Sequence, residues 1–596
     1  MNLKLSRCKL QYPKCKYKTH FCYDTSSVKR DGVSSVKGFH AGAPVTKWWR
    51  DCVIYQLYVK SFSDHDGDGV GDLDGITARL DYIAALGVDG IWLSPCYPSP
   101  DHDGGYDVAD YVDVSARYGG MDAFERLLAN THDRGLKLLM DLVPNHCSVD
   151  HSWFQEAIAA GAGSKERSRF IFRDGLGAGG TSPPNNWRST FGGPAWTRIT
   201  APDGLAEQWY LHLFDSSQPD FNWGSVEVAE MFDDVLRAWF DRGVDGFRID
   251  IAYGMVKHAG LPDVIDPEAE NPYIWNQPGV HDIFKRWRAI ADSYERELNL
   301  VGEAWLEPRA SAEYIKAGEL KQLFYFDLLS QPFGARAFKK SISESQEALV
   351  EVDGVPAWTL SNHDVFRSVT RYGLIEAETM ETTDLNAQRV RARGKVDIGL
   401  GTARAKAATL LMMALPGSVY IYQGEELGLP EVQDIPANSR RDPIWERSGH
   451  SEHGRDGSRV PIPWSGSKPS FGFSMVPPSQ QIADPWLPQP SWFDKFTVAE
   501  EESRSDSVLA FYREVLALRR TIDKTELLKW LDTEREDVLA FRRGNLISVT
   551  VFDGAPFALP GHWGEVVLRS DQGYGALPTS SGAWLLFKGL STADNQ

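Results

Sequence analysis

Helical segments that stop at a glycine and run at once into a short apolar strand recur along most of this chain. In the first such unit, apolar residues recur at helical spacing over 76–86, Gly87 ends the helix, and a strand follows. The same order returns around Gly135 and Gly243. The pattern predicts eight strands, at residues 53–58, 90–93, 136–141, 246–251, 298–302, 323–326, 357–361 and 419–422.

Eight short buried strands that alternate with helices favour a closed parallel (β/α)8 barrel, the TIM barrel, over an open doubly wound sheet. A dinucleotide-binding fold is disfavoured because no G-x-G-x-x-G follows the first strand. Hydrophobic residues make up 42% of the chain and charged residues 24%, which is typical of a globular protein. The fold class expected is therefore α/β.

Two connections are too long to be ordinary links between a strand and a helix. The first, rich in Gly, Pro, Asn and Trp, predicts an inserted subdomain after strand 3; the second, after Gln423, is typical of a lid or binding loop. A helix at 509–518 and alternating apolar residues beyond it predict a small antiparallel C-terminal β-domain. We expect the barrel at 44–146 and 219–506, the inserted subdomain at 147–218, and the C-terminal domain at 507–596.

The net charge of −19 argues against nucleic acid as a partner. The first 40 residues differ, with nine Lys or Arg against two acids, so we expect a basic, disordered tail over 1–43. No run of about 18 apolar residues predicts a membrane span, and no apolar segment of a secretory signal follows the basic residues. The cysteines lack a paired metal-site spacing and, from Cys52 on, are scattered singly, which favours a reducing compartment and a cytoplasmic protein. The oligomeric state stays open.

Acidic and polar residues follow four of the predicted strands, at the ends where a barrel carries its chemistry. They are Asp141 with Asn145 and His146, Arg248 with Asp250, Glu303, and Asn362 with His363 and Asp364. A single such carboxylate is more often part of a structural ion pair. Four coincident strand ends favour an active site.

Two of these carboxylates differ in their sequence neighbours. Arg248 and Asp250 leave the same face of one strand, so the cation is expected to lower the pKa of Asp250 and keep it ionised. Glu303 has only small or apolar neighbours, so burial without a partner is expected to raise its pKa. One nucleophile and one acid, about 5–5.5 Å apart, are what a retaining glycosidase needs.

From Trp48 to about Trp464 the chain resembles glycoside hydrolase family 13, the α-amylase family, and within it the exo-acting α-glucosidases and oligo-1,6-glucosidases. The motifs that carry the resemblance are Asp141-Leu-Val-Pro-Asn145-His146, Gly246-Phe-Arg248-Ile-Asp250, Gly302-Glu303-Ala-Trp305, Ser361-Asn362-His363-Asp364 and Gln218-Pro-Asp220-Phe-Asn222-Trp223. The resemblance implies Asp250 as nucleophile, Glu303 as general acid/base, and Asp364 as the carboxylate that holds the sugar hydroxyls. It also implies that Arg248, His146 and His363 contact the glucosyl ring, with Gln218 in the accompanying motif.

Two further segments resemble the pocket of exo-acting members. Asp103-Gly-Gly-Tyr106-Asp107 resembles the segment that grips the non-reducing end, and Arg455-Asp456-Gly-Ser-Arg459 resembles the loop whose first arginine pairs with that aspartate. Tyr106 is expected to stack on a sugar face, and Phe191 and Phe214 to line the leaving-group side. For each aromatic residue, ordinary core packing is the alternative.

The run from Asp64 to Asp72 places carboxylates at alternate positions between glycines, a pattern typical of a hard-cation loop. It is not an EF-hand, because Gly75 stands where that motif has a bidentate Glu. It resembles the family's short structural Ca²⁺ loop, which implies Asp64, Asp66, Asp68, the Val70 carbonyl and Asp72 as ligands; Mg²⁺ is the other candidate ion. No cofactor is expected for the chemistry.

The favoured function is a retaining exo-α-glucosidase acting on maltose-like oligosaccharides. A glucosyltransferase or isomerase could use the same residues, because a sugar hydroxyl can replace water in the second step. Ile251-Ala252-Tyr253-Gly254, after the nucleophile, resembles α-1,4-active enzymes more than the oligo-1,6 type. A non-catalytic transporter heavy chain is disfavoured because this chain keeps all three carboxylates and shows no membrane span.

Overall fold

The computed structural model describes residues 47–587, except for 201–205, 267–268, 379–389, 467, 478–482 and 524–527. The chain divides into two compact units, Met1–Thr46 and Lys47–Gln596, and the second is described here. The basic tail expected at 1–43 lies outside the described residues, together with Cys8, Cys15 and Cys22.

The eight predicted strands are all present, and they form one parallel sheet in the order β10-β13-β1-β2-β3-β7-β8-β9. A parallel bridge between Phe324, next to β9, and Ala357 of β10 brings the two ends of this sheet together, so it is a nearly closed barrel. Buried strands of this kind read as continuous apolar runs, which is why the sequence locates them. The strands are Val53–Leu57 (β1), Gly90–Leu93 (β2), Lys137–Leu142 (β3), Gly246–Ile249 (β7), Asn299–Gly302 (β8), Gln322–Leu323 (β9), Ala357–Thr359 (β10) and Ser418–Tyr422 (β13).

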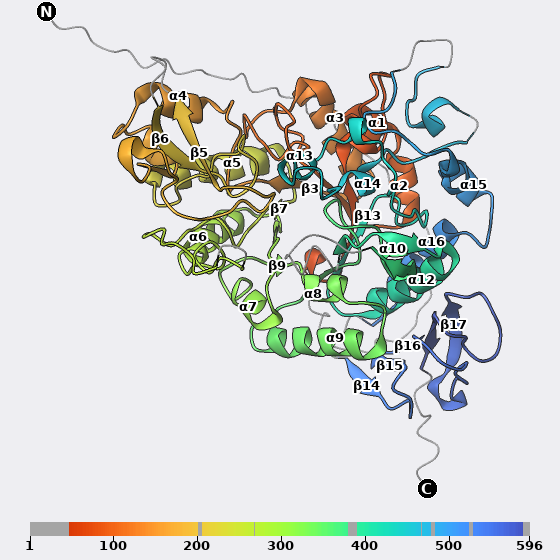
Figure 1. Cartoon of the computed structure of the whole chain (residues 1–596). Coiled ribbons are helices and arrows are strands. Elements are labelled where there is room, and N and C mark those ends of the chain that lie inside the picture. The colour runs from red at the N-terminus through yellow and green to blue at the C-terminus, as the bar shows by residue number, and fades with distance from the viewer. Residues whose placement is uncertain are drawn as a thin grey trace, which may run out of the picture. The chain divides into compact units, whose positions relative to one another are not determined.

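Helices connect these strands around the barrel (Figure 1). The continuous helix predicted over 76–86 is wrong: α1 ends at Ala78, and α2 begins at Leu80, because the Arg79 N–H bonds to Ile76 three residues back and tightens the turn. Gly87 and Gly243 end their helices in the left-handed conformation, as predicted. The helices are Leu73–Ala78 (α1), Leu80–Leu86 (α2), Gly120–Asp133 (α3), Val226–Arg242 (α5), Val280–Asp292 (α6), Pro308–Glu313 (α7), Phe326–Ser330 (α8), Ala335–Val350 (α9), Ser368–Gly373 (α10) and Ile398–Ala414 (α12).

Between β3 and α5 the chain forms the inserted subdomain. It contains helix α4 (Ser152–Ala160) and a small antiparallel sheet in the order β4-β6-β5, formed by Phe172–Arg173, Ala206–Leu211 and Trp196–Thr200. Its apolar core includes Trp187 and Trp196 and extends to Leu261 and Ile274, which follow β7. The insert therefore packs against the segment that leads away from one of the acidic strand ends.

After β13 a long segment carries the short helices α13 (Pro443–Arg447), α14 (Asp456–Arg459) and α15 (Val498–Glu502) and returns the chain across the carboxyl ends of the strands. The hairpin of β11 (Leu374–Ala377) and β12 (Gly394–Val396) lies against it, because the Gln433 amide bonds in both directions to the backbone of Gly394. The hairpin and this segment therefore lie side by side.

The C-terminal part consists of α16 (Val508–Arg519) and a five-stranded antiparallel sheet, as predicted. The strands, in the order β14-β15-β16-β18-β17, are Lys529–Leu531, Val538–Arg543, Leu546–Val551, Ser581–Leu586 and Glu565–Arg569. The sheet packs on α12, where the Trp584 indole N–H donates to the Leu410 carbonyl at 2.9 Å. None of the described helices is long and apolar enough to cross a membrane.

Candidate active site

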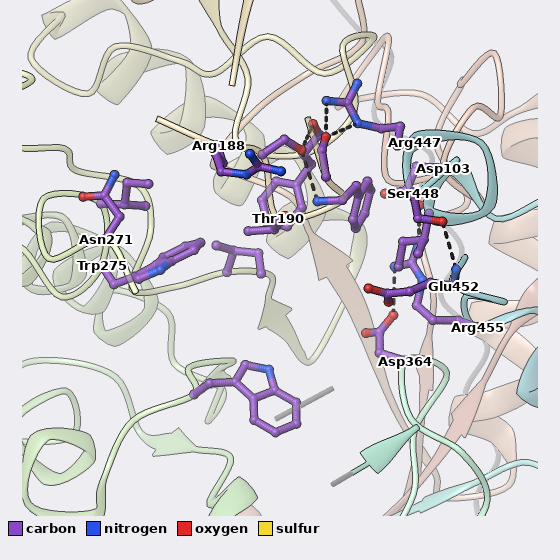
Figure 2. Close-up of a pocket in the computed structure, with 18 of the residues that line it drawn as sticks. Asp103, Arg188, Thr190, Asn271, Trp275, Asp364, Arg447, Ser448, Glu452 and Arg455 are labelled. Atoms are coloured by element: carbon purple, nitrogen blue, oxygen red, sulfur yellow. Dashed lines mark hydrogen bonds and ion pairs between the residues drawn. The ribbon is translucent and has the colours of Figure 1, made fainter. Parts of the chain in front are cut away.

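A cavity of about 870 Å³ opens at the carboxyl ends of the barrel strands (Figure 2). Asp250 follows β7 directly, Glu303 follows β8 directly, and Asp364 comes five residues after β10. Most of the sequence-predicted residues line the cavity, namely Asp103, Tyr106, His146, Phe191, Phe214, Asp250, Glu303, Asp364 and Arg455. Three others, Gln218, Arg248 and His363, are buried behind this wall and contact it.

Arg248 holds three carboxylates together at the floor of the cavity. Its Nη1 lies 2.7 Å from Asp250 Oδ1 and 2.9 Å from Asp141 Oδ1, and its Nη2 bonds to Glu303 Oε2. All four side chains are almost completely buried. Two carboxylates from neighbouring strands therefore share one guanidinium on the side that faces the cavity.

Two expectations about charge are wrong. Glu303 has a partner, because its Oε2 accepts from Arg248 and from the Ile251 N–H at 3.3 Å, so it is not an isolated carboxyl. The pKa of Asp250 is raised, not lowered: burial and the carboxylates of Glu303 and Asp141 outweigh the attraction of Arg248. Burial also raises the pKa of Asp141 to about 7. One cation does not compensate three buried carboxylates, so the cluster favours holding a proton.

Asp364 is in the opposite electrostatic situation. Burial would raise its pKa, but the guanidinium groups of Arg455 and Arg459, at 3.2 and 2.9 Å, lower it. Asp364 is therefore an anion that points into the cavity, with its side chain 25% exposed.

An ion pair that the sequence motifs predicted forms part of the cavity wall. Arg455 Nη2 lies 2.7 Å from Asp103 Oδ1, and Gln218 Nε2 donates to the other oxygen of Asp103 at 3.1 Å. Asp442, which sequence reasoning missed, accepts from Arg455 Nε at 2.7 Å. It lies in the aperiodic segment after β13, where no local pattern marks it.

The two predicted histidines lie against Tyr106. The rings of His363 and Tyr106 are stacked at 5.3 Å, and the Tyr106 hydroxyl lies 2.6 Å from His363 Nε2. His363 Nδ1 is held by the Gln56 side chain at 2.7 Å, a contact that sequence reasoning missed. Burial lowers the pKa of His146 to about 4 and that of His363 well below its usual value, so both imidazoles are neutral near pH 7.

The rest of the cavity lining combines apolar and charged side chains. The rings of Phe191 and Phe214 meet edge to face at 5.4 Å, as part of the lining. Sequence reasoning missed the other lining residues because they lie in segments without a motif. They include Arg188, Asn271, Trp275, Arg447 and Glu452 (Figure 2). Arg391 is a further lining residue.

The acidic loop lies apart from the cavity lining. Among the described residues, Asp64, Asp66 and Asp72 bring one carboxylate oxygen each within 4.8 Å of one another, whereas Asp68 is outside this group and instead accepts from the Val70 N–H at 2.8 Å. A Cβ added at Gly69 would meet a backbone oxygen at 2.2 Å, so only glycine fits this turn. Three convergent carboxylates fit a hard divalent cation.

Comparisons with known proteins agree with this geometry. The family model described as "Alpha amylase, catalytic domain" matches residues 56–527. The chain is 34% identical over 550 residues to an α-glucosidase of Candida albicans, covering 83% of this chain and 90% of that one. It is 35% identical over 522 residues to an oligo-1,6-glucosidase of Saccharomyces cerevisiae, covering 80% and 83%.

Among solved structures, the crystal structure of an α-glucosyl transfer enzyme superposes with a TM-score of 0.77 at 34% identity, covering 91% of this chain and all of that one. The barrel fold, the matched catalytic domain and these similarities all indicate the same family. The chain belongs to the α-amylase family, glycoside hydrolase family 13, and is a glycoside hydrolase.

Proposed function

We propose that this protein is a retaining exo-α-glucosidase that releases terminal glucose from short α-glucosides through a covalent glucosyl-enzyme. The observation that carries the proposal is the guanidinium of Arg248, which holds Asp250 and Glu303 side by side at the cavity floor. Two carboxyls near enough to share one cation are compatible with the separation of about 5–5.5 Å used by retaining glycosidases.

In the first step, an Asp250 oxygen attacks the anomeric carbon as the glycosidic bond breaks, and Glu303 gives its proton to the departing oxygen. In the second step, Glu303 takes a proton from water, the water oxygen attacks the anomeric carbon, and the ester to Asp250 breaks. Arg248 orients both groups. Formation of the ester removes the negative charge of Asp250 from a buried cluster in which three carboxylates share one guanidinium. This loss of charge favours the intermediate.

The remaining polar groups hold the glucosyl ring. The anionic Asp364 can accept hydrogen bonds from sugar hydroxyls, and the neutral His146 and His363 match the family's contacts around the ring. By resemblance to exo-acting members, we propose that the ion pair between Asp103 and Arg455 in the cavity wall blocks a second sugar beyond the chain end. This supports exo action.

The linkage preference is inferred from the residues that follow the nucleophile and from the relatives. The residues after the nucleophile, Ile251-Ala252-Tyr253-Gly254, favour α-1,4 linkages by resemblance, and Ile251 and Tyr253 line the cavity. The relatives include proteins named α-glucosidase and oligo-1,6-glucosidase. Since small changes in an apolar pocket discriminate by only about 1–3 kcal/mol, we propose maltose and maltooligosaccharides as preferred substrates, with isomaltose as the substrate to compare.

A second candidate function is glucosyl transfer or isomerisation. It is favoured by the similarity to a protein described as an α-glucosyl transfer enzyme. Trp275, Arg447 and Glu452 in the cavity lining offer an aromatic face and polar groups to an acceptor sugar. Transfer would use the same glucosyl-enzyme and differ only in the second nucleophile.

One assay separates these functions. The purified enzyme is incubated with maltose, isomaltose, sucrose and trehalose in parallel, at low and high concentration, and every product is quantified. Mostly free glucose at low substrate supports hydrolysis. Predominant trehalose, isomaltulose or longer oligosaccharides under the same conditions would overturn it in favour of transfer.

Two further expectations are proposals about the whole molecule. We propose a structural Ca²⁺, with Mg²⁺ as the alternative, at Asp64, Asp66 and Asp72. We also propose a cytoplasmic location, because the three cysteines that the structure describes, Cys52, Cys96 and Cys147, are buried free thiols.

A further inference from the structure

Behind the cavity wall, a buried lysine joins three separate parts of the chain. Lys257 Nζ lies 2.7 Å from Asp220 Oδ2 and 2.7 Å from Asn145 Oδ1. The Lys257 side chain is 2% exposed, and those of Asp220 and Asn145 are fully buried. Asn145 follows β3, Asp220 lies between the inserted subdomain and α5, and Lys257 follows β7. The ammonium therefore holds these three segments together.

The contact with Lys257 decides which way the Asn145 amide points. An ammonium has three donors and no acceptor. Burial lowers the pKa of Lys257, but the carboxylate of Asp220 at 2.7 Å opposes that shift and favours the charged form. The atom of Asn145 that faces Lys257 must therefore be the oxygen. The amide nitrogen is left on the other side, where it lies 3.0 Å from Nδ1 of His146.

The orientation of the Asn145 amide determines which ring nitrogen of His146 carries the proton. An amide nitrogen only donates, so His146 Nδ1 must present its lone pair. Because the ring is neutral, its proton then sits on Nε2, which lies 3.2 Å from the Tyr106 carbonyl. Nε2 also lies 3.2 Å from Gln218 Nε2, but the Gln218 oxygen accepts from the Asp215 N–H, and its nitrogen donates to Asp103 at 3.1 Å.

We propose that Lys257 is a positioning residue that fixes the Asn145 amide and, through it, the tautomer of His146, so that the imidazole presents its Nε2–H at the cavity wall. The role extends the proposed function, because His146 lines the cavity and its Nε2–H, which faces the Tyr106 carbonyl, is the donor that a sugar hydroxyl would share with that carbonyl. Lys257 itself does not line the cavity, and its effect passes through Asn145.

The sharpest test replaces one atom. In Asn145→Asp, one carboxylate oxygen still faces Lys257, and the second stands where the amide nitrogen was. An oxygen opposite Nδ1 accepts, so Nδ1 gains the proton. Ring nitrogens are observed by long-range ¹H–¹⁵N correlation at pH 8 on the full chain labelled at histidine. The chain has 14 histidines, and the His146 signals are assigned by their loss in His146→Gln.

We expect an unprotonated Nδ1 and a protonated Nε2 in the wild type, and a proton on Nδ1 in Asn145→Asp. In Lys257→Met the amide is free to turn, and both ring nitrogens should show averaged signals. Lys321→Met is the matched control, because Lys321 is an equally buried lysine paired with Glu297 at 2.8 Å but outside the cavity lining. Its His146 signals should equal those of the wild type.

An Nδ1 that stays unprotonated in Asn145→Asp would overturn the proposal, as would a wild-type Nδ1 that carries the proton. If Lys257→Met does not fold, the near-isosteric Asn145→Asp carries the test alone. The kinetic readout rests on the proposed function: kcat/KM for maltose should fall about tenfold in Asn145→Asp as one substrate hydrogen bond is lost. The tautomer is measured without substrate, so its outcome is independent of whether the protein is a glucosidase.

Discussion

Arg455 and Asp103 lie 2.7 Å apart in the wall of the cavity, although they are 352 residues apart in sequence. Burial raises the pKa of Asp103 to about 6, and Arg455 opposes that shift. Arg455 also contacts Asp442 and Asp364. This one guanidinium therefore links Asp103 to a proposed sugar-binding carboxylate (Figure 2).

The substitution Asp103→Asn should lower kcat/KM for maltose about 10- to 100-fold. It removes a charge-assisted contact worth about 1.5–3 kcal/mol while Arg455 keeps Asp442 and Asp364 as partners. Steady-state kinetics of the purified variant provide the measurement. Asp74→Asn, which breaks a surface pair with Arg126 at 2.7 Å, is the control and should retain wild-type kinetics. Unchanged kcat/KM in Asp103→Asn would contradict a role for the ion pair in binding the chain end.

The substitution Asp250→Asn should abolish turnover while leaving the fold intact. An amide cannot attack the anomeric carbon, so kcat should fall at least about 10⁴-fold, as for other removed nucleophiles. Since burial already raises the pKa of Asp250, a neutral isostere at this position should leave Tm unchanged or raise it. Activity assays and thermal unfolding together measure both effects.

The matched control for Asp250→Asn lies at the opposite end of the same strand. Asp245 is buried just before β7 and pairs with Lys137 at 3.0 Å, away from the cavity. Asp245→Asn should lower Tm but retain kcat per folded molecule. Substantial turnover in Asp250→Asn would refute its assignment as nucleophile.

The barrel was predictable for two reasons. Its strands are buried on both faces and so form apolar runs, and several of them follow a helix that ends at a glycine. Both features are visible in the local sequence. The break at Arg79 was not predictable, since the apolar spacing continues across it. The carboxylates at the strand ends, from Asp141 to Asp364, could also be found from the local sequence. The pKa shift of Asp250 could not be predicted, because the sequence pairs Arg248 only with its neighbour Asp250. The other two partners of Arg248, Asp141 and Glu303, lie 107 and 55 residues away.

A buried carboxyl behind the site should make stability depend on pH. Burial raises the pKa of Glu431 to about 8, while in the unfolded chain it is about 4.3. The folded state therefore holds a proton that the unfolded state releases, and stability falls as pH rises from about 4.5 to about 8. The contribution is about 1.4 kcal/mol per pH unit for one group.

The variant Glu431→Gln keeps the shape and removes this titration, so its Tm should decline less than that of the wild type between pH 5.5 and 8. Thermal unfolding across this range gives the comparison. Glu344→Gln, on the exposed face of α9, is the control and should follow the wild-type curve. Parallel curves for Glu431→Gln and wild type would show that this carboxyl is not protonated in the folded state.

Removal of divalent cations should lower Tm without changing the chemistry. An ion that binds only the folded state stabilises it by about 2.7 kcal/mol at a concentration 100 times Kd. Excess EDTA should therefore lower Tm by several degrees, with kcat unchanged below the transition because the loop does not line the cavity.

Asp72→Asn tests the ligand assignment. Asp72 Oδ1 also caps α1 by accepting from the Gly75 N–H, and asparagine caps equally well. The variant should thus unfold at the same temperature with and without EDTA, whereas a wild-type Tm that is insensitive to EDTA and to added Ca²⁺ would exclude a stabilising ion at this loop.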